Sequence, residues 1–125
     1  MIGYVTLGTN DLPRAAAFYD GLLALVGAKR FMEMDRSIAW SAGPTSPGLS
    51  VGKPFDGKPA NVGNGVMVAL AVDKKEKVDA LYKKALQLGG KDEGPPGPRG
   101  TSGFYAAYFR DLDGNKLCAF TMGGK

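Results

Sequence analysis

The stretch GYVTLGTNDLPRAAAFYDGLLALVG, residues 3–27, decides the fold because it joins a strand to a helix. Residues 4–7 are rich in side chains that favour β-strands. Asn10 and Asp11 offer N-cap oxygens to the backbone amides that follow them. Apolar side chains then recur at helical spacing, and Gly27 supplies the left-handed residue at which many helices end. This stretch predicts a β-strand at 4–7 and an α-helix at 12–26.

Strand-like stretches follow this first helix and repeat later in the chain. Three of them come directly after the helix: AKRFMEMD (28–35), SIAWSAG (37–43) and PGLSVGKP (47–54). GVMVALAV (65–72) then predicts a strand that precedes a second helix. Three more strand-like stretches end the chain: KDEGPPGPR (91–99), FYAAYFRD (104–111) and NKLCAFTM (115–122). Each half of the chain is therefore predicted to have the order βαβββ.

The second helix is predicted from DKKEKVDALYKKALQLGG, residues 73–90. Asp73 and Glu76 have the spacing of a capping box at its start. The apolar stripe that should face the core consists of Val78, Leu81, Tyr82, Ala85 and Leu88. The lysines between these positions are expected to lie on the solvated side of the helix.

The two halves repeat at a fixed offset. Asp11 and Asp73 are 62 residues apart, and so are Gly27 and Gly89. A half of about 55 residues is marginally stable alone, so we expect the halves to share a core. We predict an α+β protein with one domain, residues 1–125. It consists of a first module at about 1–53, a Gly- and Pro-rich linker at 54–64 and a second module at about 65–125.

The composition excludes several classes of active site. The 125 residues contain no histidine and one cysteine, Cys118. Without histidine, Ser-His-Asp and Cys-His catalysis and the usual His-ligated zinc and iron sites are impossible. A single thiol rules out an internal disulfide. The 16 basic and 12 acidic residues give a net charge of +4, which favours anionic ligands without requiring nucleic acid.

The sequence also argues against a membrane partner. No apolar run approaches the roughly 20 residues that cross a bilayer. The N-terminus MIGYVTLGTN does not have a basic segment followed by an apolar one, as a secretion signal would. We therefore expect a cytoplasmic protein.

Two motifs connect this pattern to a known family. The first is DLPRAAAFY, residues 11–19, of the form DLxRAxxFY, and the second is DLDGN, residues 111–115, of the form DxDGN. Together with two βαβββ modules, they resemble the vicinal oxygen chelate superfamily, which includes glyoxalase I, extradiol dioxygenases, and the fosfomycin- and bleomycin-resistance proteins. The resemblance implies eight strands that curl as one sheet around a cleft, with the helices outside. It also implies a small-molecule partner and often a homodimer.

Enzymes of that superfamily hold a divalent metal in the cleft through ligands on strands one, four, five and eight. In this sequence the first, fifth and eighth positions fall on Tyr4, Met67 and Cys118, and residues 48–52, which include no carboxylate, cover the fourth. A phenol, a thioether and a thiol are poor ligands for Mg²⁺, Mn²⁺ or Zn²⁺. The resemblance is thus to a member that lacks the usual metal ligands, and we predict no metal and no cofactor.

The same three residues are predicted to face the cleft, opposite the apolar rows that pack against the helices. Tyr4 is either a proton donor or hydrogen-bond anchor for a ligand, or an amphipathic residue that fills the space of the missing metal. Met67 is predicted to fill apolar space. Cys118 is either a nucleophile or a buried, inert thiol.

Four further side chains complete the predicted ligand site. Trp40 either faces the cleft as a stacking surface, which we favour, or fills the core. Arg99, on the proline-stiffened loop GPPGPRG, leads into the strand that contains Tyr105 and Tyr108. It is the leading candidate for a polar anchor. Its guanidinium either clamps a carboxylate or phosphate beside these rings or is a solvent-exposed charge.

Three functions remain open. The first is a metal-free protein that binds a small neutral or anionic organic molecule. The second is a glyoxalase-like or dioxygenase-like lyase, isomerase or transferase, with acid–base chemistry by Tyr4, Cys118, Glu33 or Asp35. The third is a non-enzymatic partner or regulatory subunit that uses the fold for its dimer surface.

Overall fold

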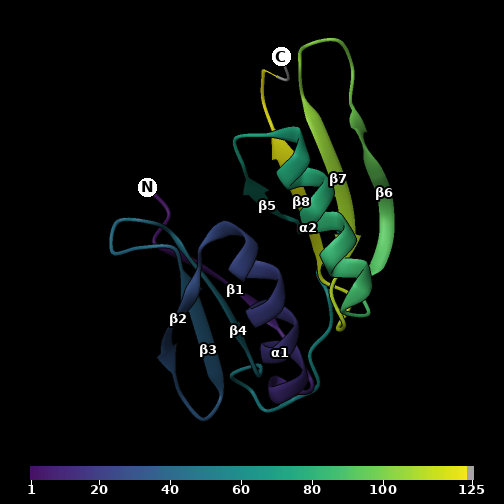
Figure 1. The fold of residues 1–125 in the computed structure, drawn as a ribbon. Helices are drawn as coiled ribbons and strands as arrows, with labels where there is room; N and C mark the ends of the chain where they lie inside the picture. Colours follow the sequence, from purple (N-terminus) through teal and green to yellow (C-terminus); the bar gives the residue numbers. More distant parts are fainter. Residues whose placement is uncertain (124–125) are drawn as a thin grey trace.

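The computed structural model describes residues 1–123 and contains two βαβββ modules (Figure 1). The first consists of β1 (Tyr4–Gly8), α1 (Leu12–Leu23), the 3₁₀ turn η1 (Ala24–Val26), β2 (Lys29–Glu33), β3 (Ser37–Ser41) and β4 (Gly48–Gly52). The second consists of β5 (Val68–Ala71), α2 (Lys75–Gln87), β6 (Lys91–Pro98), β7 (Tyr105–Arg110) and β8 (Lys116–Thr121). The predicted α+β class and the two-module order are confirmed.

Each module forms a four-stranded sheet, in the orders β1-β4-β3-β2 and β5-β8-β7-β6. The pairs β1–β4 and β5–β8 are parallel, and the other pairs are antiparallel. The resemblance implied one curled sheet of eight strands, whereas the described chain has two separate sheets. β1 and β5 are edge strands of their own sheets, and no backbone ladder joins one sheet to the other in the described chain.

The first helix begins and ends as its sequence predicts. An Asp11 carboxylate oxygen accepts from the Arg14 amide at 3.2 Å. The last turn tightens into η1, and Gly27 then adopts the left-handed conformation with φ of 75°.

The capping box predicted for the second helix is wrong. The N-cap of α2 is Lys74, in an extended conformation and without a side-chain cap bond. The Val72 amide still donates to the Phe120 carbonyl at 2.9 Å, so the chain continues along the sheet and turns into the helix later than predicted. Asp73 instead pairs with Lys77 at 2.8 Å across one helical turn.

Each helix lies on one face of the sheet of its own module (Figure 1). One cluster of buried apolar side chains runs through both modules. It includes Phe18 and Leu22 of α1, Leu81 of α2 and Phe109 of β7. The expectation of a shared core is therefore confirmed. Neither α1 nor α2 is long and apolar enough to cross a membrane.

A buried hydrogen-bond network joins the two modules. The Tyr19 hydroxyl in α1 donates to Asp111 at 2.5 Å, and Asn115 donates to Asp111 and to the Gly8 carbonyl, both at 2.9 Å. Burial, together with the charge of Asp111, raises the pKa of Tyr19 well above its usual value. The motif DLDGN therefore serves as a turn that also fixes one module on the other. Asn10, directly before the first motif, adds a further bond from its backbone amide to the Asp113 carboxylate at 3.0 Å.

Candidate functional site

The face of the second sheet that α2 leaves uncovered carries a cluster of four polar or ionisable side chains. Tyr108 on β7 is the register partner of Cys118 on β8. Lys116 lies two residues before Cys118 and so projects from the same face. Arg99 reaches this face from the loop after β6. We call Arg99, Tyr108, Lys116 and Cys118 the Tyr108 cluster.

The Tyr108 cluster is positively charged. The guanidinium carbon of Arg99 lies 5.5 Å from the Tyr108 ring centroid, and the ammonium of Lys116 lies 5.3 Å from it. Within residues 1–123, neither cation has a carboxylate partner at ion-pair distance. Two cations beside one aromatic ring have the chemistry to attract an anionic group attached to a planar or apolar body.

Backbone carbonyls of β6 hold Arg99 in place. Its Nη1 donates to Gly97 at 2.9 Å and its Nη2 donates to Pro95 at 2.7 Å. The three prolines of this edge strand restrict its backbone, so the carbonyls that accept from Arg99 are held in place. Of the two interpretations of Arg99, this geometry favours the anchor over a freely mobile charge.

Cys118 is the buried floor of the cluster, with 1% of its surface exposed. Burial raises the pKa of its thiol, and the hydrogen bond with Tyr108 and the charges of Arg99 and Lys116 oppose that rise only in part. The thiol is therefore protonated at neutral pH, which favours the inert interpretation of Cys118 over the nucleophile.

Tyr4 lies on the open face of the first sheet, with 66% of its surface exposed. It lines a cavity of about 520 Å³ together with Phe31 and Gly48. A Cβ at Gly48 would meet the Phe31 ring and the Cβ of Tyr4, both at 3.3 Å, so the glycine leaves room for these two side chains over the sheet. Met67, just before β5, lies in a separate apolar cavity of about 430 Å³.

Two predicted site residues face the helices instead of the open faces. Trp40 is 1% exposed and donates its indole N–H to Asp20 of α1 at 2.9 Å, so the favoured placement in the cleft is wrong. The Tyr105 hydroxyl donates to Asp79 of α2 at 2.7 Å. Tyr105 and Tyr108 are three residues apart on one strand and therefore project from opposite faces.

Two residues on the open faces of the sheets, Lys116 and Phe31, were not among the predicted site residues. Strand alternation placed Lys116 on the face of Cys118, but nothing in the sequence indicated that it would lie over a tyrosine ring. Phe31 lies on the edge strand β2 and is 58% exposed. A phenylalanine in a strand is expected to pack into the core, so its sequence position did not suggest an exposed ring.

The residues at the superfamily's metal positions do not fit a divalent ion. Tyr4, Met67 and Cys118 offer a phenol, a thioether and a protonated thiol, and Ser50 at the centre of β4 offers a hydroxyl. Nowhere in the described chain do three side chains of His, Cys, Asp or Glu come together.

Comparison with known proteins gives consistent matches over nearly all of the chain. The sequence profile of the Glyoxalase/Bleomycin resistance protein/Dioxygenase superfamily matches residues 1–119. A glyoxalase/bleomycin resistance protein from Albidiferax ferrireducens is 34% identical, with a TM-score of 0.88, and the match covers 97% of this chain and 98% of that one. A hypothetical protein from S. aureus is 27% identical, with a TM-score of 0.71 and coverage of 97% and 96%.

More distant structures share the fold alone. A lactoylglutathione lyase from Agrobacterium tumefaciens is 21% identical, with a TM-score of 0.70, and the match covers 97% of this chain and 92% of that one. No curated protein matches the sequence.

Proposed function

Because the chain belongs to the glyoxalase/bleomycin resistance protein/dioxygenase superfamily, we propose that it is a metal-free protein that binds a small organic molecule. The ligand is anionic or neutral and lies on the Tyr108 cluster. The observation that carries this proposal is the pair of unpaired cations, Arg99 and Lys116, each within 5.5 Å of the Tyr108 ring centroid. A carboxylate accepts hydrogen bonds from the cations while an attached ring packs on the tyrosine.

Three probes of similar size and different charge test this proposal. Benzoate, benzyl alcohol and benzylammonium share one ring and differ by one charge at each step. Ligands that bind the folded state raise the unfolding temperature. We expect millimolar benzoate to raise it most, benzyl alcohol less and benzylammonium not at all, by thermal unfolding at constant ionic strength. A rise with benzylammonium as large as that with benzoate would contradict the proposal.

Divalent metals are expected to leave the stability unchanged. The donor set of Tyr4, Met67 and Cys118 offers no ionised carboxylate or imidazole. Protein without a histidine tag, unfolded thermally with and without Mn²⁺, Zn²⁺, Ni²⁺ and Fe²⁺, should give the same midpoint in every case. Stoichiometric metal by elemental analysis, together with a raised midpoint, would overturn this part of the proposal.

We also propose a homodimer, in which a second copy covers the apolar cavity beside the edge strands β1 and β5. Ile2, Val66 and Met67 line this cavity and are 55%, 53% and 42% exposed in the single chain. Burying such a patch at a symmetric interface stabilises association. Light scattering should give about twice the 13.1 kDa mass of the chain, and a particle of one chain mass would refute the dimer.

The enzyme alternative has less support from the site. The thiol of Cys118 stays protonated, and Glu33 is paired with Arg30 at 2.9 Å. Asp35 lies in the exposed turn between β2 and β3. The cytoplasmic location of the protein stays a prediction.

A further inference from the structure

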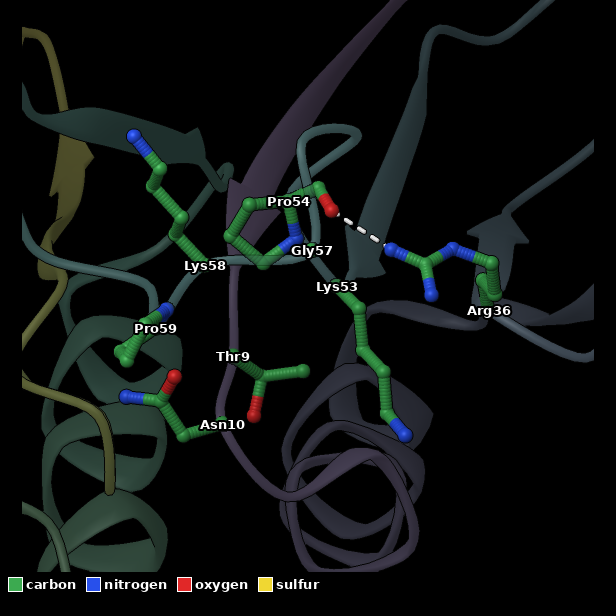
Figure 2. Close-up of a pocket in the computed structure, with 8 residues that line it drawn as sticks. All are labelled: Thr9, Asn10, Arg36, Lys53, Pro54, Gly57, Lys58 and Pro59. Atoms are coloured by element: carbon green, nitrogen blue, oxygen red, sulfur yellow. Dashed lines mark hydrogen bonds between the residues drawn. The ribbon is translucent and has the colours of Figure 1, made fainter.

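A second cationic cavity, of about 310 Å³, lies in the first module, at the end of the sheet where the parallel strands β1 and β4 both finish (Figure 2). Its walls come from Thr9 and Asn10 after β1, from Arg36 between β2 and β3, and from five residues after β4: Lys53, Pro54, Gly57, Lys58 and Pro59. None of these residues belongs to the Tyr108 cluster, which lies in the other module.

The cavity carries three positive charges, on Arg36, Lys53 and Lys58, and no carboxylate lines it. None of the three cations is ion-paired with a carboxylate of the described chain. Asp56 belongs to the same loop, but its carboxylate accepts from the Lys58 amide at 2.9 Å and does not line the cavity.

Hydrogen bonds fix the walls of the cavity. Arg36 donates from Nη2 to the Pro54 carbonyl at 2.5 Å, and the Lys53 amide donates to the Arg36 carbonyl at 2.8 Å. On the opposite side, Asn10 donates to the Ala60 carbonyl at 3.1 Å and accepts from the Ala60 amide at 2.6 Å. The loop is therefore held at both ends, so little order has to be created when a ligand binds.

The side chains divide into two groups. Arg36 and Lys53 lie on one side of Pro54, whereas Lys58 extends away on the other side (Figure 2). The bond to Pro54 uses one nitrogen of Arg36 and leaves Nε and Nη1 without an acceptor among the described residues. An arginine with free donors beside a lysine is the arrangement that recognises an oxyanion with two or more negative oxygens.

We propose that this cavity binds the phosphate group of a small molecule, with Arg36 and Lys53 as the principal ligands of its oxygens. A phosphate monoester near neutral pH carries close to two negative charges, which two cations neutralise. Thr9 and Asn10 form the adjacent polar wall. This site is independent of the Tyr108 cluster and of the ligand proposed there.

Inorganic phosphate is the probe that tests this assignment. Amide NMR of the ¹⁵N-labelled protein, titrated with phosphate against chloride at constant ionic strength, should give saturable shifts at Thr9, Asn10 and Gly57. A charge-assisted hydrogen bond is worth about one tenfold step in affinity or more, so Arg36→Gln and Lys53→Gln should each weaken binding about tenfold. Lys83→Gln on the exposed side of α2 makes the same change of charge and should leave the affinity unaltered.

Three outcomes would overturn the proposal. They are shifts that do not saturate, shifts that saturate only at residues outside the cavity, and equal weakening in all three variants, which would show a general effect of charge. Arg36 also bonds to the Pro54 carbonyl, so replacing it could disturb the loop as well as remove a charge. Arg36→Lys keeps the charge at this position, and Lys53→Gln removes a charge without breaking the bond to Pro54. A Lys53→Gln protein that folds and binds phosphate like the parent would refute the site by itself.

Discussion

Replacing Asp111 with alanine is expected to lower the free energy of unfolding by about 3–5 kcal/mol. This carboxylate is 4% exposed and accepts four hydrogen bonds, from the Tyr19 hydroxyl, the amides of Asp113 and Asn115, and the Asn115 side chain. Removing it leaves buried donors without acceptors at the junction of the two modules. Urea unfolding followed by the fluorescence of Trp40, whose ring lies 5.7 Å from that of Tyr19, measures the loss.

Two variants separate this network from a general loss of charge. Asp113→Ala also removes one carboxylate of the same turn, but this carboxylate accepts a single, exposed bond from the Asn10 backbone amide, so we expect a cost of about 1 kcal/mol. Tyr19→Phe removes a single donor and should cost about 1–2 kcal/mol. If Asp111→Ala unfolds at the same urea concentration as Asp113→Ala, the network does not hold the modules together.

Replacing both cations of the Tyr108 cluster is expected to abolish detectable benzoate binding. Arg99→Gln and Lys116→Gln each remove one charge-assisted hydrogen bond to a carboxylate, which corresponds to about a tenfold loss of affinity. The two losses combine in the double variant, because both side chains would contact the same anion. Isothermal titration with benzoate, or the shift of the unfolding temperature, measures the effect.

The matched control for this experiment is a double change of equal charge elsewhere. Lys83→Gln with Lys91→Gln alters two exposed positions, one on α2 and one on β6, outside the Tyr108 cluster. It should bind benzoate as the parent does. Equal losses in both double variants would mean that benzoate responds only to the net charge of the chain.

Much of the fold could be predicted because it depends on local patterns. The N-cap at Asp11, the left-handed Gly27 and the repeat of βαβββ are all set by neighbouring residues. The capping box at Asp73 failed because a tertiary bond, from Val72 to the carboxyl-terminal strand, decides where the chain leaves the sheet. The separation into two sheets depends on how the modules meet, which local spacing does not encode.

For the candidate site, the sequence could predict only which side chains of one strand share a face, from the alternation of the strand. Alternation placed Cys118 and Lys116 on one face, and the register then brought Tyr108 opposite Cys118. It gave no basis for placing Trp40, because the choice between the two faces of β3 depends on its contact with Asp20 and Tyr19. The position of Arg99 depends on carbonyls of its own loop, which the sequence suggests through its prolines but does not determine.

The most direct test of the account is to map where benzoate binds by amide NMR of ¹⁵N-labelled, tag-free protein. We expect saturable shifts concentrated at Tyr108, Lys116, Cys118 and the loop that carries Arg99, with α1 and α2 unaffected. Saturable shifts confined to the first module, around Tyr4 and Phe31, would contradict it and move the ligand site to the other sheet.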